Sequence, residues 1–365
     1  MRTGISRKAI LPGARIRVLV VDDSVVIRRL VTHALSEDPA LEVVGAASNG
    51  AIALERIAQL NPDAITLDIE MPEVDGLAVL RSIRNREARP RVVMFSTLTD
   101  RGAALTLESL ALGADDYVTK AANVGSLDRS MASLRTELIP KIKQFFLMPG
   151  DASQAGSPKA ATPPQRLTPI AMMRQPKVLA IGVSTGGPTA LGAIIPRFPA
   201  DFPLPILIVQ HMPPLFTRFL AERLQSGAKL RVEEASDGAP VVAGSVLIAP
   251  GDYHMRVRGS GGETVVRLDQ AAPENSCRPS VDVLFRSIGE LYGGAAISAV
   301  LTGMGQDGLR GAAMLKANGA FVIAQDEATS VVWGMPGAVA GAGLANCVVP
   351  LDSVVSEVLT QVGNG

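Results

Sequence analysis

Short apolar runs alternate with amphipathic helical patterns along most of the chain. Within residues 15–146 the segments that predict strands are RIRVLVV, LEVVGAA, DAITL, RVVMF and DDYVT. Between them, residues 25–35 and 51–60 show helical spacing of apolar positions, and a residue–proline pair follows each. Alternating strands and helices with short connections predict an α/β domain built on a doubly wound parallel sheet.

The composition changes at residues 147–176, where Ala, Ser, Pro, Gln and Gly predominate and no periodic apolar face is present. This composition predicts a flexible linker. From 177 to 361 the alternation resumes, which predicts a second doubly wound α/β domain of Rossmann-like type. Its loops APGDYHM and RGSGGET indicate a β-hairpin insertion.

Composition and charge narrow the class of protein. The chain has 365 residues, enough for two hydrophobic cores, and a formal net charge of zero, so no bulk attraction to nucleic acid is expected. No apolar run reaches the roughly 18 residues of a membrane span, and the basic first ten residues lack the apolar segment of a secretory leader. Cys277 and Cys347 form no disulfide framework and are predicted to be small buried hydrophobes. We therefore expect a cytoplasmic protein without direct membrane insertion.

Polar residues at the strand ends of the first domain predict a phosphoryl-accepting site. Asp22 and Asp23 end the first strand and Asp68 ends the third, so they should meet at one crevice. Carboxylates this close repel one another, and oxygen ligands favour Mg²⁺. Ser96 ends the fourth strand and Lys120 follows the fifth, which adds a hydroxyl and an ammonium group around Asp68. The alternative is that these aspartates are solvated residues that begin loops.

Four segments of the first domain are similar to a known domain family: VLVVDDS, LDIEMPEVDG, VVMFSTLT and DDYVTK. Residues 15–146 resemble the receiver domain of bacterial response regulators, which implies a five-stranded flavodoxin-like fold. The resemblance implies phosphorylation of Asp68 by a chemotaxis histidine kinase. It also implies Mg²⁺ bound by Asp23, Asp68 and the backbone carbonyl of Glu70, with Asp22 as a further candidate.

Two other features of the receiver follow from this resemblance. Ser96 and Tyr117 match the pair that shifts when the phosphoryl group arrives, and Lys120 belongs to the same switch. Ala121 stands where receivers usually have proline, which leaves open whether the preceding peptide bond is cis.

A second set of chemical groups lies in the second domain. Ser184, His211 and Asp307 each follow a buried-type apolar run, so they should converge on one edge of a parallel sheet. A hydroxyl nucleophile, an imidazole base and a carboxylate form the set that acyl hydrolysis requires. Residues 182–186, GVSTG, match G-x-S-x-G at a predicted strand-to-helix turn, and Pro188 fits the first helical position. The N–H groups that begin this helix can face an oxyanion.

Each of these residues also has an interpretation that involves no acyl hydrolysis. The glycine-rich turn could be a dinucleotide phosphate loop, although G-x-G-x-x-G and the acidic residue expected further along the chain are absent. Asp307 could simply cap a helix, and the chain order Ser, His, Asp differs from that of α/β-hydrolases. His211 could be an ordinary polar residue. Of the other histidines, His33 is predicted at a helix surface, and His254 could line the cleft.

The segments IGVSTGGP, QHMP, IAPGDYHM, CRPSVDVLF, LTGMGQDG and AQDEATSVVWGMP occur in order over the second domain. Residues 177–361 resemble the catalytic domain of the CheB chemoreceptor methylesterase family. This implies hydrolysis of glutamate γ-methyl esters on methyl-accepting chemotaxis receptors, deamidation of receptor glutamines, and no cofactor for the esterase. Ser184, His211 and Asp307 would form the catalytic triad.

The same resemblance suggests further site residues. Backbone N–H groups at Thr185 and Met304 are candidates for the oxyanion hole, and Arg278 and Ser280 are candidates for substrate contact. Trp333 and the three residues after it either shape the cleft floor or pack.

Two other functions stay open at this stage. One is a response regulator whose output domain binds a partner without catalysis. The other is a nucleotide-dependent oxidoreductase, which the missing dinucleotide fingerprint disfavours. If the chain is an esterase, we expect the unphosphorylated receiver to cover the cleft and phosphorylation of Asp68 to release it.

Overall fold

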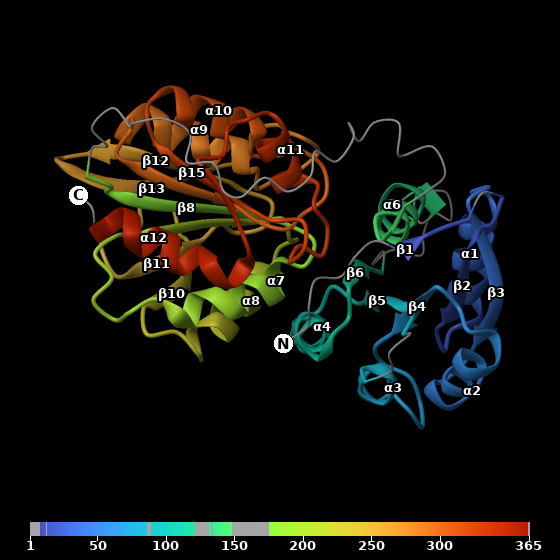
Figure 1. Cartoon of the computed structure of the whole chain (residues 1–365). Helices are drawn as coiled ribbons and strands as arrows, with labels where there is room; N and C mark the ends of the chain where they lie inside the picture. The colour runs from blue at the N-terminus through green and yellow to red at the C-terminus, as the bar shows by residue number, and fades with distance from the viewer. Residues whose placement is uncertain are drawn as a thin grey trace. The chain divides into compact units, whose positions relative to one another are not determined.

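The computed structural model describes residues 8–11, 13–85, 89–120, 131–132, 134–147 and 175–363 (Figure 1). Lys8 to Leu147 belong to one compact unit, and Gln175 to Gly363 belong to a second. Ala121, and all of the predicted linker except its terminal residues, lie outside the described residues.

The first unit is built on a parallel sheet whose five strands match the five predicted apolar segments. The strand order is β3-β2-β4-β5-β6, so that β3 lies on one side of β2 and the later strands follow in order on the other. This order confirms the flavodoxin-like prediction. The strands are β2 (Ile16–Val21), β3 (Leu41–Ala47), β4 (Ala64–Asp68), β5 (Arg91–Ser96) and β6 (Asp116–Thr119).

The helices of this unit begin where the sequence supplies a capping side chain. Ser24, Asn49, Asp75 and Thr99 each accept a hydrogen bond from the backbone N–H three residues further on. The short strands β1 (Lys8–Ala9) and β7 (Phe146–Leu147) pair with each other, so this unit extends slightly beyond the predicted 15–146. The helices are α1 (Val25–Ser36), α2 (Gly50–Leu60), α3 (Gly76–Ile83), α4 (Asp100–Leu112), the π-helical η1 (Leu134–Leu138) and α6 (Ile139–Lys143).

The second unit contains a seven-stranded parallel sheet in the order β10-β11-β9-β8-β14-β15-β16. Every residue of the three central strands is buried, as their near-continuous apolar sequences predict. The strands are β8 (Val178–Val183), β9 (Ile206–Gln210), β10 (Arg231–Glu234), β11 (Ser245–Ile248), β14 (Ala296–Val300), β15 (Phe321–Gln325) and β16 (Cys347–Val349). The antiparallel pair β12 (His254–Ser260) and β13 (Glu263–Asp269) confirms the predicted hairpin insertion.

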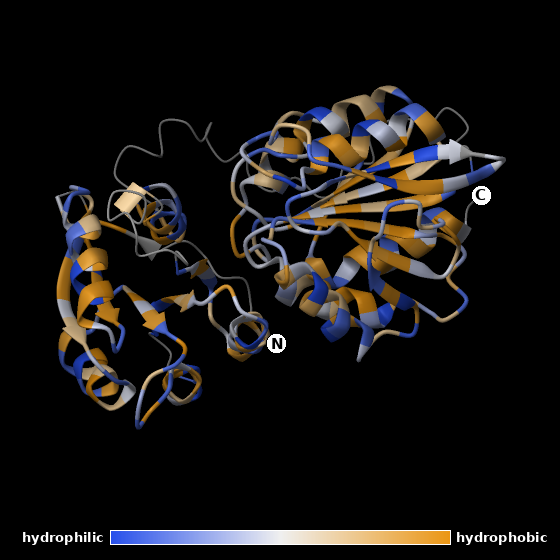
Figure 2. Cartoon of the chain, turned by 180° about the vertical axis from the view of Figure 1, so that it is seen from behind, coloured by the Kyte–Doolittle hydropathy of each residue, from blue (hydrophilic) through white to orange (hydrophobic). Residues whose placement is uncertain are grey.

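Helices cover both faces of this sheet, so the second unit is doubly wound as predicted. In Figure 1, α9 (Val281–Tyr292), α10 (Leu309–Ala317) and α11 (Met335–Gly341) lie on one face. The other face carries α7 (Gly187–Ile194), α8 (Phe216–Gln225) and α12 (Val354–Gly363), with the 3₁₀ turns η3 (Ile195–Arg197) and η4 (Leu351–Ser353). Figure 2 shows the strands between these layers as mainly hydrophobic.

None of the described helices is long and apolar enough to cross a lipid bilayer.

Candidate active site and phosphorylation site

Three neighbouring strands of the second unit bring Ser184, His211 and Asp307 to one edge of the sheet. Ser184 directly follows β8, His211 directly follows β9, and Asp307 lies in the loop after β14; β8 is hydrogen-bonded to both other strands. The backbone ladder continues past the strand ends, because Ser184 N–H donates to the Thr302 carbonyl (3.0 Å) and His211 N–H donates to the Val183 carbonyl (3.2 Å). The convergence predicted from the sequence is therefore present in the fold.

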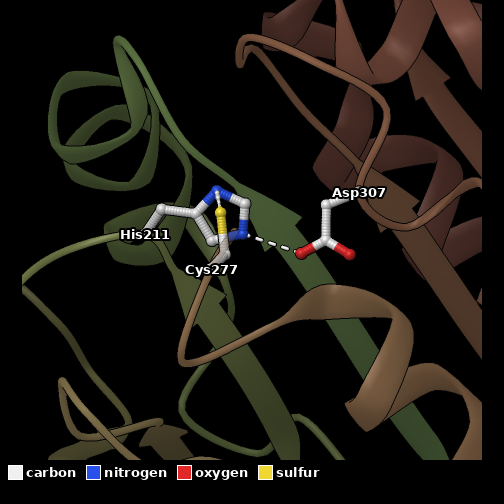
Figure 3. Close-up of side chains that lie close together, drawn as sticks. All are labelled: His211, Cys277 and Asp307. Carbon is white, nitrogen blue, oxygen red and sulfur yellow. Dashed lines mark hydrogen bonds and ion pairs between the residues drawn. The ribbon is translucent and has the colours of Figure 1, made fainter. Parts of the chain in front are cut away.

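The imidazole of His211 contacts the carboxylate of Asp307 (Figure 3). The distance from Nε2 to Oδ2 is 2.8 Å. A carboxylate can only accept at this contact, so Nε2 carries the hydrogen and Nδ1 is the nitrogen left for proton transfer. The His211 side chain is 12% exposed and that of Asp307 is 2% exposed, which keeps this pair largely away from water.

Asp307 is held by the N-terminus of α9 and not only by its own loop. Its oxygens accept hydrogen bonds from the backbone N–H groups of Val281 (2.7 Å), Asp282 (3.1 Å) and Gly308 (3.0 Å). The Nδ2 of Asn275 also donates to it, at 2.7 Å. The capping alternative is thus partly right, although the helix capped is α9 and not the following α10, and the same carboxylate also orients His211.

The electrostatics of the pair follow from these contacts. Burial alone would lower the pKa of His211, but hydrogen bonds to Asp307 and Cys277 outweigh burial and raise it above its ordinary value. Burial would raise the pKa of Asp307, but His211 and the α9 N–H groups outweigh burial and lower it to about 2. Asp307 is therefore a carboxylate that stabilises an imidazolium on His211.

Ser184 is half-buried at the turn between β8 and α7. Gly186 has a φ of 79°, and a Cβ on Gly187 would lie 1.8 Å from Oε1 of Gln210, so this turn requires small residues. The helix begins at Gly187, which places Pro188 second and not first as predicted. No hydrogen bond joins the Ser184 hydroxyl to His211 within the described part of the chain.

Gln210, which no sequence pattern indicates, connects the segments that carry Ser184 and His211. Its buried amide donates from Nε2 to the carbonyls of Ser184 (3.0 Å) and His211 (3.2 Å). These bonds fix the backbone of the serine relative to that of the histidine. Gln210 is a positioning residue in this arrangement.

Both predicted substrate contacts form hydrogen bonds within the protein. Ser280 is fully buried and donates from Oγ to Asp307 (2.9 Å), so it cannot touch a substrate. The guanidinium of Arg278 donates to Asp252 and to the carbonyls of Gln270 and Ala271 (3.0 Å each). These hydrogen bonds of Arg278 stabilise the loop in which it lies.

The predicted oxyanion residues lie beside the serine turn. Thr185 is buried, and its carbonyl accepts a hydrogen bond from Thr302 Oγ1 at 2.9 Å. Met304 is exposed and lies next to Gly303, whose Cα is so close to Ser184 that a Cβ there would lie 2.8 Å from the serine Cβ. Trp333 donates from Nε1 to the Gln325 carbonyl (2.9 Å) and packs on α11, which fits the packing interpretation.

Both cysteines differ from their prediction, and His254 does not take the open alternative of a cleft residue. Cys277 is not a small buried hydrophobe: it is half-buried, with Sγ 3.5 Å from His211 Nδ1. His254 does not line a cleft, because it is 1% exposed and its ring nitrogens contact Ser280 N–H and the Ala272 carbonyl. Cys347 is half-buried as well, and partial burial raises the pKa of its thiol to about 12. His33 is exposed as expected.

In the first unit, carboxylates and one ammonium group gather at the carboxyl ends of the strands. Oxygens of Asp22, Asp23 and Asp68 lie within 4.8 Å of one another. Lys120 Nζ lies 2.9 Å from Asp22 and 2.7 Å from Asp68. Burial, together with the charge of Asp22, raises the pKa of Asp68 to about 6 despite Lys120. An excess of hard oxygen donors that repel one another fits a divalent cation such as Mg²⁺.

The two predicted switch residues contact other elements. The Ser96 hydroxyl donates to the Gly102 carbonyl on α4 (3.1 Å) and accepts from Thr106 Oγ1 (2.6 Å). Tyr117 is buried, and burial raises its pKa well above the ordinary value. The Lys141 ammonium lies 4.8 Å from the centre of the Tyr117 ring. The side chain of Glu70 pairs with Arg101 (2.9 Å), so only its backbone carbonyl bears on the metal prediction.

Comparison with known proteins identifies both units. Residues 179–358 match the family model of the CheB methylesterase, and residues 18–132 match that of the response regulator receiver domain. A protein-glutamate methylesterase/protein-glutamine glutaminase from Trichodesmium erythraeum is 48% identical, with 96% of this chain and 99% of the relative covered. A protein of the same name from a Nocardioides species is 51% identical, with 96% of both covered. The chain belongs to the CheB methylesterase family.

A solved structure agrees with this assignment. The CheB methylesterase catalytic domain of Thermotoga maritima is 44% identical and superposes with a TM-score of 0.50, over 51% of this chain and 99% of that one. Membership of the CheB family makes the chain a hydrolase with a receiver domain. The oxidoreductase and the non-catalytic output domain are therefore excluded.

The raised pKa of Asp68 predicts an effect on stability. Folding raises this pKa from 3.8 to about 6. The protonated Asp68 carboxyl therefore makes its full contribution to the free energy of unfolding below about pH 4, and this contribution is lost as the pH rises through about 6. At neutral pH without Mg²⁺, the charged Asp68 carboxylate then lowers the free energy of unfolding by about 3 kcal/mol. We expect Asp68→Asn to raise the thermal unfolding midpoint of the first unit at neutral pH, with little effect near pH 4. Glu55→Gln, which removes an exposed carboxylate of α2 outside this cluster, is the control and should leave the midpoint nearly unchanged. A lowered midpoint for Asp68→Asn would contradict the expected effect.

Proposed function

We propose that this chain hydrolyses glutamate γ-methyl esters on methyl-accepting chemotaxis receptors, and deamidates receptor glutamines, at Ser184, His211 and Asp307. The catalytic domain is assigned to residues 177–361. The observation that carries the proposal is the 2.8 Å contact between His211 and Asp307 at the edge of the sheet where the neighbouring strand ends in Ser184. Methanol release from methylated receptor membranes tests it.

In the proposed mechanism Ser184 Oγ attacks the ester carbonyl while His211 Nδ1 takes the hydroxyl proton. Asp307 accepts from Nε2–H, fixes the tautomer and stabilises the imidazolium. Backbone N–H groups at Thr185 and Met304 are assigned to the developing oxyanion. The imidazolium then protonates the leaving methoxide, methanol departs, and water activated by His211 hydrolyses the acyl-serine to glutamate. An amide substrate follows the same course and releases ammonia, and none of these steps needs a cofactor.

The receiver, assigned to residues 15–146, supplies the regulation. Asp68 would receive a phosphoryl group from a chemotaxis histidine kinase. Asp23, Asp68, the Glu70 carbonyl and Asp22 would hold the Mg²⁺ that offsets the negative charge of that group. The three clustered carboxylates and the adjacent Lys120 support this assignment.

We assign to the unphosphorylated receiver a restraining effect on the esterase, which phosphorylation of Asp68 relieves. Residues 147–176 act as the linker in this scheme and keep the two domains at a high effective concentration. Ser96, through its contacts with α4, and Tyr117 would transmit the change. Activation of about tenfold to a hundredfold requires only about 1.4 to 3 kcal/mol of difference between the two states.

A fragment from Gln175 onward is expected to hydrolyse receptor methyl esters about tenfold faster or more than the unphosphorylated full chain, because the restraint is gone. In the full chain, Asp68→Asn should stay at the basal rate when a phosphodonor such as acetyl phosphate is added. Initial rates of methanol release measure both effects. A fragment no faster than the unphosphorylated chain would rule out restraint and would require the receiver to stimulate the esterase directly.

A further inference from the structure

Cys277 lies at the end of a tight turn beside the proposed triad. In the turn of residues 274–277, Asn275 and Ser276 have φ values of 53° and 62°. Glu274 and Cys277 exchange two backbone hydrogen bonds of 2.9 and 3.1 Å. Two consecutive residues in the left-handed region form the tight reversal of a primed turn, and asparagine tolerates this region well. The sulfur is thus carried by a closed, well-defined piece of backbone.

Side chains on both sides of Cys277 fix this turn in place. Glu274 forms a double ion pair with Arg286 at 2.6 Å for each contact, and Asn275 donates to Asp307 (2.7 Å) and Asp282 (3.0 Å). After the turn, Arg278 donates to Asp252 (2.9 Å from Nε). Ligand atoms held in this way need little rearrangement to bind an ion.

The position of the sulfur suits a soft metal ion. Sγ lies 3.5 Å from His211 Nδ1 (Figure 3). Zinc–sulfur bonds of about 2.3 Å and zinc–nitrogen bonds of about 2.0 Å at a tetrahedral angle place the two ligand atoms roughly 3.5 Å apart. Asp307 holds the other ring nitrogen, which is the support that zinc-binding histidines usually have. Ligand atoms of Cys277, His211 and Asp307 all lie within 4.8 Å of one another.

We propose that Cys277 and His211 form a binding site for a thiophilic divalent ion such as Zn²⁺, and that the bound ion inhibits the esterase. The thiol releases its proton to solvent, the thiolate and the Nδ1 lone pair bind the ion, and water completes the coordination. Inhibition follows because Nδ1 is then unable to take the proton of Ser184. The receiver carboxylates offer only oxygen, which favours Mg²⁺, so the two sites differ in the ions they select. Inhibition rests on the proposed function, whereas metal binding does not.

Cobalt(II) is the probe for binding, because thiolate coordination gives a sulfur-to-cobalt charge-transfer absorption that oxygen ligands do not give. The full chain is titrated with Co²⁺ in excess Mg²⁺, which occupies the receiver carboxylates. The charge-transfer band is expected for the parent chain, for Cys347→Ser as the matched cysteine control, and for the inactive Ser184→Ala. It should be absent from Cys277→Ser. Loss of the band in Cys347→Ser but not in Cys277→Ser, or no band in the parent chain, would overturn the site.

Zinc inhibition of methanol release is measured in the same variants, each relative to its own metal-free rate. The concentration for half-inhibition should rise at least about tenfold in Cys277→Ser and stay unchanged in Cys347→Ser, as expected for loss of one of two protein ligands. Equal zinc sensitivity of Cys277→Ser and the parent chain would overturn the inhibitory role. Because the cobalt band requires no turnover, a chain without esterase activity would refute the proposed function and still leave the metal site testable.

Discussion

Replacing Ser184 with alanine is expected to reduce methanol release from methylated receptor by about 10³-fold or more, because the members of a triad act as a unit. Folding should be retained: Ser184 is half-buried, and no described residue receives a hydrogen bond from its hydroxyl. Phosphorylation of Asp68 should be unchanged, since that site lies in the other unit. Initial rates, thermal unfolding and phosphorylation by acetyl phosphate measure the three properties.

Ser226→Ala is the matched control, because it removes an exposed hydroxyl of the same unit at the end of α8. Its rate should equal that of the parent chain. If Ser184→Ala kept more than about a tenth of the activity, Ser184 would not be the nucleophile.

Asp307→Asn should lower the rate about 10²- to 10⁴-fold, because an amide in place of Oδ2 cannot accept from Nε2–H and favours the tautomer with its hydrogen on Nδ1. The same change removes the acceptor of the Val281 N–H, so a stability loss of about 1–3 kcal/mol accompanies it. Rates are measured well below the unfolding midpoint of the variant, so that only folded enzyme is compared.

Ser280→Ala separates the two roles of Asp307. It deletes one hydrogen bond to the carboxylate at the α9 terminus and leaves the contact with His211 intact. A modest loss of stability with a near-parental rate is expected for this variant. A near-parental rate for Asp307→Asn would mean that Asp307 only caps α9.

The parts of the fold that follow from local sequence were predictable. Strands such as β8 and β9 are near-continuous apolar runs because helices cover both faces of the sheet, and no other element of this length fits such runs. Since parallel strands end at a common edge, the sequence alone predicts that Ser184, His211 and Asp307 lie close together.

The contacts that depend on tertiary packing were not predictable. Nothing in the sequence indicates that residues 274–277 turn back so that Cys277 reaches His211, because that position depends on the pairing of Glu274 with Arg286 and of Asn275 with Asp307. The sequence indicates Ser280 as a site residue, but it does not show that this side chain is fully buried against Asp307. Polar residues near a buried carboxylate can equally well satisfy it, and Ser280 does so at the α9 terminus.

The most direct test of the central claim is methanol release from receptor membranes carrying labelled methyl esters, with the full chain in the presence of Mg²⁺. The account predicts release by the parent chain, faster release with a phosphodonor, and none above background by Ser184→Ala. Absence of methanol release by the folded, phosphorylated parent chain, or equal release by Ser184→Ala, would contradict it.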